Sequence, residues 1–310
     1  MENGVSDLPR ILKIALLHTD KEESYGQRLQ CLFEEWFQAI IEDYNNHSLS
    51  SSNIVRKFHQ PIFVELVKVD ALNENYPTTE EWNSFDGVLV PGSSSSAFEN
   101  EKWILGLKNI IRKLFVNRKP LLGICFGHQI INAALGGKVA QNKHGTVVGR
   151  VSSEITTPLE KTKSFMQKYT TISDFSSNGA QKISLLHSHR DIVTSLPSSF
   201  AVLLEDGSLQ QENVRCWRVA GSQNSENNVM FHASGEGLPF VFTVQGHPEL
   251  STNSGVFSFR DISYARFQKT KDISEIQLQK SLKESTASTD SLVIGRIALE
   301  LFLRGKLDLI

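Results

Sequence analysis

Cysteine is scarce in this sequence, and its arrangement excludes two classes of site. Three cysteines occur in 310 residues, at positions 31, 125 and 216. Their number is odd, they lie far apart, and no pair has the Cys-x-x-Cys spacing. A disulfide framework and a cysteine-based zinc site are therefore not expected. This usage is typical of a protein from a reducing compartment.

The sequence also lacks long runs of one charge or of apolar residues. It has 32 basic and 34 acidic residues, a net charge of −2, and no block of a single sign. A nucleic-acid footprint or a polybasic membrane patch is therefore not expected. No stretch reaches the about 18 apolar residues of a membrane span, and "MENGVSDLPRILKIALLHTD" is too polar for a secretory leader. We predict a cytoplasmic protein with no membrane or nucleic-acid partner.

Apolar patterns in the first 138 residues indicate strands that alternate with helices. Continuous apolar runs predict buried strands, and apolar residues at helical spacing predict helices. The predicted strands are 11–18, 62–71, 85–93 and 119–127, and the predicted helical faces lie in 29–44, 103–114 and 128–135. Such alternation favours an α/β fold with a mostly parallel central sheet and helices on both faces.

Beyond residue 138 the pattern changes to short strand-like runs without long helices between them. These runs predict a small antiparallel sheet that flanks the main one. No repeat or convincing linker divides the chain, so we predict a single domain over 11–304. Polar insertions are expected as loops near 45–53 and 221–228, followed by a helical extension over 260–310.

The heptapeptide "GICFGHQ" places Cys125 where a predicted strand turns sharply into a helix. Gly123 and Gly127 flank the cysteine at the spacing of a nucleophile elbow, where close backbone contacts leave no room for a Cβ. The positive end of the following helix would stabilise a thiolate, and the N–H of Phe126 would point toward an oxyanion. The alternative is a buried cysteine that only fills space, because free cysteine is often buried.

A second motif, "QGHPE", follows an apolar strand and supplies a candidate base. Pro248 stiffens the backbone between His247 and Glu249. Residues two apart in an extended chain point to the same side, so Glu249 can hydrogen-bond the imidazole and fix its tautomer. Alternatively, His247 ends a strand and Glu249 is a solvated or helix-capping acid.

Two further segments carry polar groups. In "VLVPGSSSS" (88–96) a strand runs into a Gly/Ser loop, whose backbone N–H groups could bind an anion or could form a plain turn. The loop lacks the lysine of a phosphate-binding P-loop. In "LLHSHRDIV" (185–193), His187 and His189 have no third metal ligand at useful spacing, so main-chain contacts with a polar substrate are favoured over a metal site.

Four motifs in this order, PGS, GICFGHQ, HSHRD and QGHPE, resemble the class I (triad-type) glutamine amidotransferases over residues 11–250. The resemblance implies a flavodoxin-like α/β fold and hydrolysis of a γ-glutamyl amide through a γ-glutamyl thioester, with no cofactor or metal. It implies that Cys125 is the nucleophile, His247 the base and Glu249 its partner. It also implies oxyanion donors at Phe126 and at Gly92 or Ser93, and substrate contacts at Gln129, Ser188 and His189.

Two departures from the common pattern refine this resemblance. Gly246 stands where the family usually has an aromatic residue before the histidine, and the loop reads PGS rather than PGG or GGP. With GICFGHQII, these features resemble the free-standing eukaryotic branch that includes plant γ-glutamyl peptidases and fungal GMP-synthase-like amidotransferases. We hypothesise that Gly246 opens space beside the base for a leaving group larger than ammonia.

Three functions remain open from the sequence. The first is a glutaminase or amidotransferase, which would need a separate acceptor subunit because about 60 residues follow the motifs; its close alternative is a peptidase that acts on glutathione or its conjugates. The second is another cysteine hydrolase or chaperone-like protein with the same elbow. Those relatives place a histidine directly after the cysteine, where this chain has Phe126. The third is a non-catalytic regulatory relative.

Overall fold

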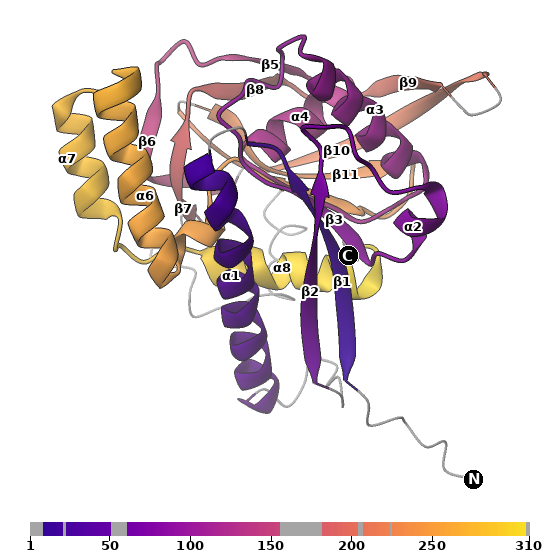
Figure 1. The fold of residues 1–310 in the computed structure, drawn as a ribbon, viewed down its shortest axis with the longest axis horizontal. Coiled ribbons are helices and arrows are strands. Elements are labelled where there is room, and N and C mark those ends of the chain that lie inside the picture. Colours follow the sequence, from indigo (N-terminus) through magenta and orange to yellow (C-terminus); the bar gives the residue numbers. More distant parts are fainter. Residues whose placement is uncertain are drawn as a thin grey trace.

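The computed structural model describes residues 9–20, 23–50, 61–155, 182–203, 207–223 and 225–307. In these ranges the chain forms one large mixed sheet, a two-stranded sheet and surrounding helices (Figure 1). None of the helices in the described ranges is long and apolar enough to cross a membrane. The cytoplasmic location stays a prediction.

Five parallel strands form one half of the large sheet. Their order is β2 (Ile62–Asp70), β1 (Arg10–His18), β3 (Gly87–Val90), β4 (Leu121–Ile124) and β12 (Val241–Val244). Every residue of β3, β4 and β12 is buried. Continuous burial on both faces is the reason that these strands read as unbroken apolar runs.

Antiparallel strands continue the same sheet beyond β12. They follow in the order β11 (Ser225–Ser234), β10 (Leu209–Ser222), β6 (Val147–Ile155) and β7 (Lys182–His189), with β9 (Ser199–Leu203) paired to β10. A separate two-stranded sheet joins β5 (Lys138–Gln141) and β8 (Asp191–Ser195). The predicted α/β class, with a parallel block and antiparallel strands beside it, is confirmed.

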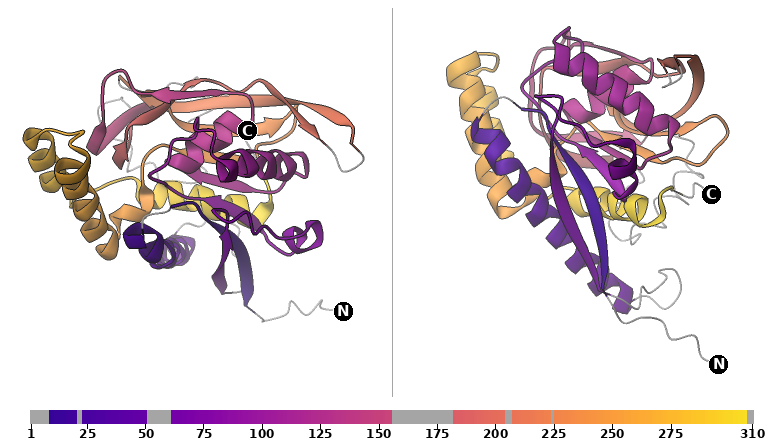
Figure 2. Two further views of the ribbon diagram at one scale, coloured as in Figure 1. Left: turned by 45° about the horizontal axis from the view of Figure 1, so that its top comes forward. Right: turned by 45° about the vertical axis from the view of Figure 1, so that its right-hand side comes forward.

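Helices cover both faces of the parallel block (Figures 1 and 2). On one face α1 (Glu23–Ser50) and α8 (Ser291–Arg304) contribute to one apolar core, and on the other face α3 (Lys102–Val116) and α4 (Phe126–Ala134) contribute to a second. The short helix α2 (Thr79–Asn83) precedes β3. These buried faces match the periodicities read from the sequence.

The C-terminal part of the chain is helical and lies beside β7 and β6 (Figure 1). After β12 come the short 3-10 turn η2 (Pro248–Ser251), α6 (Asn253–Ala265), the π-helical turn η3 (Arg266–Thr270), α7 (Glu275–Glu284) and α8. The extension therefore returns to the body of the protein and packs against it.

The two predicted polar loops are not loops in the described residues. The segment 221–228 lies mostly in the β10–β11 hairpin, where Ser222 pairs with Ser225. Asn227 and Asn228 are buried in this hairpin, where Asn227 donates to the carbonyl of Val193 at 2.8 Å and Asn228 donates to Ser153 at 2.8 Å.

The second segment, 45–53, departs from the prediction in a different way. Helix α1 continues through Ser50, and residues 51–53 lie outside the described part of the chain. Packing of the preceding helical turns against the core outweighs the weak helix propensity of serine and asparagine.

Candidate active site

Cys125 sits in a strained turn between β4 and α4. Its backbone has φ 53° and ψ −104°, a left-handed φ that an L-residue rarely adopts. Such a conformation costs about 1–3 kcal/mol, and residues that adopt it cluster at active sites and ligand-binding turns. The N–H of Cys125 donates to the carbonyl of Val244 on the neighbouring β12 at 2.9 Å, which fixes the turn to the sheet.

The two glycines of the motif are required by close backbone contacts. A Cβ on Gly127 would lie 1.8 Å from the carbonyl oxygen of Val90, and one on Gly123 would lie 2.7 Å from the carbonyl oxygen of Gly127. The N–H of Gly127 donates to Pro91 at 3.0 Å. The prediction that this turn has no room for a Cβ is confirmed.

His247 and Glu249 form a buried pair next to Cys125. The Nδ1 atom of His247 lies 2.7 Å from Oε1 of Glu249, and both residues are almost completely buried. The predicted contact is present, but its geometry differs from the extended step expected, because residues 248–251 form a 3-10 turn that begins after His247. The N–H of His247 donates to Leu186 of β7 at 2.7 Å, which anchors the base to a second strand.

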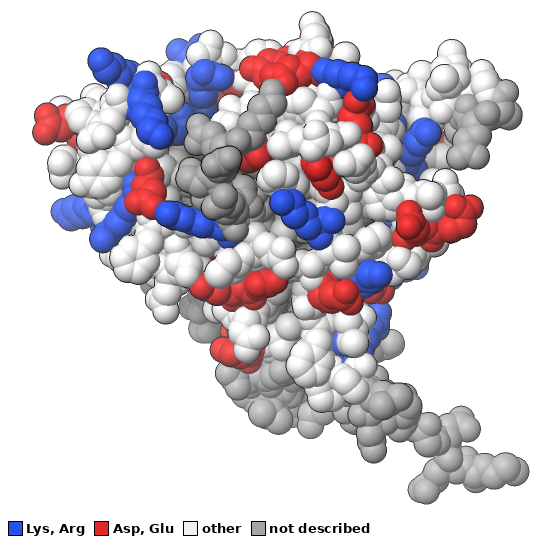
Figure 3. Space-filling view, viewed as in Figure 1, with Lys and Arg blue, Asp and Glu red and all other residues white. Residues whose placement is uncertain are grey.

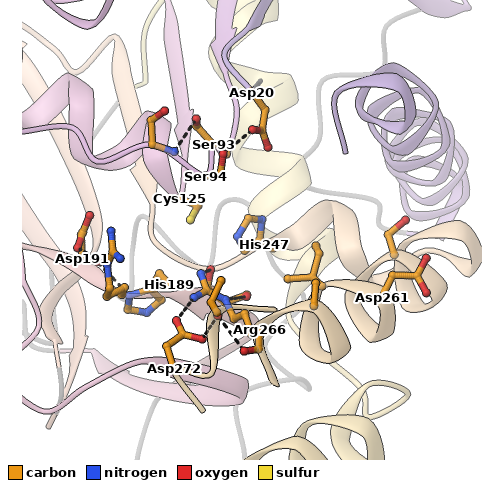
Figure 4. A pocket seen from close by; sticks show the side chains of 18 of the residues that line it. Asp20, Ser93, Ser94, Cys125, His189, Asp191, His247, Asp261, Arg266 and Asp272 are labelled. Atoms are coloured by element: carbon orange, nitrogen blue, oxygen red, sulfur yellow. Dashed lines mark hydrogen bonds and ion pairs between the residues drawn. The ribbon is translucent and has the colours of Figure 1, made fainter. Parts of the chain in front are cut away.

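The surroundings of His247 favour its protonated form. Burial alone would lower its pKa, but the charges and hydrogen bonds of Cys125 and Glu249 raise it to about 10. Figure 4 shows the Cys125 sulfur and the His247 ring facing the same cavity. The arrangement can therefore hold a thiolate and an imidazolium as an ion pair.

The Gly/Ser loop after β3 is fixed next to the cysteine. The hydroxyl of Ser93 donates to the carbonyl of Thr19 at 2.6 Å and accepts the N–H of Ser95 at 3.1 Å, while the hydroxyl of Thr19 donates to Gly92 at 3.0 Å. Gly92 and Ser93 line the same cavity as Cys125. The predicted oxyanion donors of this loop thus lie at the cavity wall.

The third predicted donor, Phe126, is the first residue of α4. Its N–H belongs to the first helical turn, where backbone N–H groups have no partner within the helix. Its ring packs against Trp103 with 5.7 Å between the ring centroids, so the side chain belongs to the core.

Gln129 is buried at the floor of the cavity. Its Nε2 donates to the carbonyl of Asp191 at 2.8 Å and to Oε1 of Gln245 at 3.1 Å. Because the nitrogen is committed to these acceptors, the side-chain oxygen is the atom that could accept a hydrogen bond from a ligand.

Ser188 and His189 end β7 and also line the cavity. His189 contacts His187 through its Nε2 atom at 3.1 Å and the carbonyl of Asp191 through its Nδ1 atom at 3.1 Å. Burial lowers the pKa of His189 to about 3 and that of His187 well below its usual value. These two histidines are therefore neutral, unlike His247. Among the described residues, no cluster of three histidine, cysteine or acidic side chains could hold a metal ion.

Gly246 does not open space beside the base, so the space that we expected there for a larger leaving group is not present. A Cβ at this position would lie 2.6 Å from Cβ of Leu185 and 2.8 Å from Nε2 of His187. The volume that an aromatic side chain would take is thus filled by two neighbours from β7.

The cavity has a volume of about 340 Å³, and the sequence motifs account for only part of its wall. The C-terminal extension supplies one side, as Figure 4 shows for Asp261, Arg266 and Asp272. The charged lining residues that the motifs did not single out are Asp20, Arg28, Arg190, Asp191, Asp261, Arg266, Lys269 and Asp272. Arg190 and Asp191 stand inside the HSHRD motif and could have been found there, whereas no local pattern points to the residues of α6 and η3.

Charges in and around the cavity are mixed in sign. The hydroxyl of Ser96 donates to Asp191 at 2.5 Å and accepts from Arg190 at 3.1 Å, and Arg28 pairs with Asp261 at 2.6 Å. Figure 3 likewise shows acidic and basic side chains interspersed on one face of the molecule. The wall of the cavity thus carries charges of both signs.

Comparison with known proteins gives a consistent picture. The sequence model of the family "Glutamine amidotransferase class-I" matches residues 44–259. Gamma-glutamyl peptidase 2 of Arabidopsis thaliana is 31% identical over 132 residues, which cover 43% of this chain and 49% of that protein. The chain thus spans about half the length of this relative.

Two matches extend over nearly the whole chain. A Schizosaccharomyces pombe protein named as glutamine amidotransferase-like is 25% identical over 91% of this chain and 96% of its own length. A crystal structure of a glutamine amidotransferase from Thermotoga maritima has a TM-score of 0.58 at 16% identity and covers 94% of this chain and 98% of its own. The structural match supports the fold alone.

Proposed function

This chain belongs to the class-I glutamine amidotransferase family, and on that premise we propose that it hydrolyses a γ-glutamyl amide with Cys125 as nucleophile, His247 as base and Glu249 as its orienting partner. One observation supports this most strongly: a strained elbow cysteine shares a cavity with a buried histidine whose pKa is raised to about 10 by that cysteine and by Glu249. A packing cysteine would need neither the strain nor the partner.

The first half of the reaction forms a thioester. The Cys125 thiolate attacks the γ-carbonyl carbon, and the negative charge that develops on oxygen is stabilised by backbone N–H groups of Phe126 and of Gly92 or Ser93. The C–N bond then breaks, and the imidazolium of His247 gives its proton to the leaving amine. Gln129, Ser188 and His189 hold the glutamyl group at the cavity floor and wall.

The second half returns the enzyme to its starting state. Neutral His247 takes a proton from water, which attacks the thioester carbonyl, and the Cys125 thiolate leaves as glutamate forms. The proton gained by His247 restores the ion pair, with Glu249 holding the ring in one orientation. These residues supply the nucleophile, acid, base and oxyanion donors, so we propose that the reaction needs no cofactor.

The proposal is tested by glutamate release from L-glutamine with the wild-type protein and two cysteine variants. Cys125→Ala is expected to abolish release while leaving the fold intact, and Cys216→Ala, which changes a cysteine outside the cavity, is the matched control. Wild-type activity in Cys125→Ala would refute the assignment and favour a non-catalytic or differently built relative.

A γ-glutamyl peptidase is the second candidate, favoured because a relative bears that name and because the cavity continues from Cys125 to the C-terminal extension. Rates with glutamine, glutathione and a glutathione S-conjugate separate the two. Preference for glutamine, increased by a co-purifying acceptor subunit, supports the amidotransferase. Preference for the conjugate supports the peptidase.

A further inference from the structure

Arg266 reaches the cavity from the C-terminal extension, outside all of the sequence motifs. It is the first residue of the π-helical turn η3, and such turns occur frequently at functional sites. Its Nε donates to the hydroxyl of Ser188 at 2.8 Å and its Nη2 to the carbonyl of Ser188 at 3.2 Å. The guanidinium is thus fixed at the strand end that the family resemblance assigns to substrate contacts.

Asp272 holds the other side of this guanidinium. It accepts from Nη1 of Arg266 at 2.5 Å, from Thr146 at 2.9 Å and from Thr270 at 2.5 Å. Burial by itself raises the pKa of Asp272, but these hydrogen bonds and the charge of Arg266 hold it below its usual value. Asp272 is therefore an anion that orients Arg266 within the cavity wall.

Part of the hydrogen-bonding capacity of Arg266 is still available. An arginine has five N–H donors, and three are used by Ser188 and Asp272. One N–H on each terminal nitrogen has no acceptor among the described residues, and about a fifth of the side chain (22%) is exposed. An orientated, partly desolvated guanidinium with such donors is suited to a carboxylate.

The spacing between Ser188 and the strand position that anchors His247 is similar to the length of a glutamyl group. The carbonyl of Leu186 on β7 accepts the N–H of His247. Ser188 lies two residues further along the same strand, so about 7 Å separates it from Leu186. The γ-carbonyl and α-carboxyl carbons of a glutamyl group are four bonds apart, about 5 Å when extended. A substrate that places its γ-carbonyl at Cys125 and extends along β7 would bring its α-carboxylate toward Arg266.

The other cations of the cavity are less suited to this task. Arg190 is committed to Ser96 and to Asp191, and its side chain is 45% exposed. Arg28 pairs with Asp261 with both side chains largely exposed, and Lys269 is exposed. Water screens exposed charges, so each contributes less to binding than a fixed, partly buried guanidinium.

We propose that Arg266 is a specificity-determining residue that binds the α-carboxylate of the γ-glutamyl substrate, an inference that rests on the proposed function. The C-terminal extension then completes the substrate site instead of only stabilising the fold. A charged hydrogen bond of this kind changes affinity by about 10- to 100-fold.

The test compares two substrates that differ only at the α-carboxyl group, L-glutamine and L-glutamine α-amide, by ammonia release. The wild-type protein is expected to favour glutamine through a lower KM. Arg266→Gln is expected to raise KM for glutamine by about 10- to 100-fold with little change in kcat. The KM for the α-amide is expected to stay nearly unchanged. Arg266→Lys keeps the charge but loses the planar guanidinium that can donate two parallel hydrogen bonds, so its KM for glutamine is expected to lie between those of the wild type and Arg266→Gln.

The matched control is Arg260→Gln, which removes an arginine of the same segment that contacts Ser285 and does not line the cavity. It is expected to leave the preference unchanged. If Arg266→Gln keeps the wild-type preference for glutamine, or loses both substrates equally, the inference is overturned.

A second readout separates this inference from the proposed function. Binding of L-glutamate to the Cys125→Ala protein, measured by calorimetry, does not depend on turnover. In the double variant that also carries Arg266→Gln, the affinity for L-glutamate is expected to be about 10- to 100-fold weaker. Weakened binding together with a wild-type protein that releases neither ammonia from glutamine nor glutamate from glutathione or its S-conjugate would refute the proposed function and support Arg266. Unchanged binding would overturn the role of Arg266 even in an active enzyme.

Discussion

Replacing Glu249 by glutamine removes one charge from the buried pair while keeping the shape of the side chain. Glu249 accepts from Nδ1 of His247 at 2.7 Å and is fully buried. The amide of Glu249→Gln can present either its oxygen or its nitrogen to the ring, so it neither fixes the tautomer nor stabilises a charged imidazole. We therefore expect two effects, a lower kcat and a lower pKa of His247.

The expected decreases in the pKa of His247 and in kcat can both be given a magnitude. The pKa of His247 is about 10 against an ordinary value of 6.5, which at about 1.4 kcal/mol per pH unit is a preference of about 5 kcal/mol for its protonated form. Cys125 and Glu249 both raise the pKa of His247, whereas burial lowers it. A neighbouring opposite charge moves a pKa by about 1–3 units, so Glu249→Gln should lower that of His247 by this amount. Loss of acid–base positioning should reduce kcat by about 10²- to 10⁴-fold.

The assay is the pH dependence of kcat/KM for glutamate release. In the wild-type protein His247 must donate a proton to the leaving amine, so activity should fall as the pH rises through its pKa, near 10. In Glu249→Gln this basic limb should move to lower pH. The raised pKa also means that the bound proton stabilises the fold fully below about pH 6.5, and this contribution is lost as the pH rises through about 10.

The matched control is Glu300→Gln, a buried carboxylate that pairs with Arg304 away from the cavity. This change is expected to lower stability without moving the basic limb. A Glu249→Gln enzyme whose basic limb and kcat match those of the wild type would refute the assigned roles of both His247 and Glu249.

Two glycine substitutions test the backbone geometry of the site. Gly127→Ala would put a Cβ 1.8 Å from the carbonyl of Val90. It should therefore lower the free energy of unfolding, measured by thermal unfolding, by at least the about 1–3 kcal/mol typical of overpacking, and abolish glutamate release. Gly106→Ala on α3, where the neighbour is the flexible side chain of Glu74, should be tolerated, and equal losses in the two variants would contradict this reading. Gly246→Ala should lower both stability and kcat because its Cβ would press on Leu185 and His187 of β7, whereas unchanged kcat would show that the space is open after all.

The sequence predicted the parts of this protein that depend on local patterns. Buried parallel strands read as continuous apolar runs, and amphipathic helices as repeats of about 3.6 residues, so the α/β class and the elbow at Cys125 could be inferred. The hairpin over 221–228 could not, because the side-chain N–H groups of Asn227 and Asn228 donate to Val193 and Ser153, which lie far away in the sequence. The role suggested for Gly246 failed for the same reason, since the filling side chains come from β7.

The contribution of the C-terminal extension is another long-range feature. Arg266 contacts Ser188 across 78 residues of sequence. Nothing in the polar composition around 266–272 distinguishes a cavity wall from an exposed turn, because the difference arises only when α6 packs beside η2 and brings η3 to β7. Loop and turn chemistry can thus be read locally, but the partner of a polar side chain at a tertiary contact cannot.

The order of the strands explains why the catalytic geometry and the substrate wall should respond differently to mutation. Neighbouring strands β3, β4 and β12 carry the Gly/Ser loop, Cys125 and His247 beyond their carboxyl ends, and ladder hydrogen bonds hold such strands about 4.8 Å apart. The reacting groups are therefore positioned by the most buried part of the sheet, at the edge where α/β proteins bind ligands. Arg266, by contrast, belongs to the turn η3, which lies outside the sheet and carries none of the proposed reacting groups. Substitutions in the extension should consequently change KM and substrate preference, and substitutions at the strand ends should change kcat.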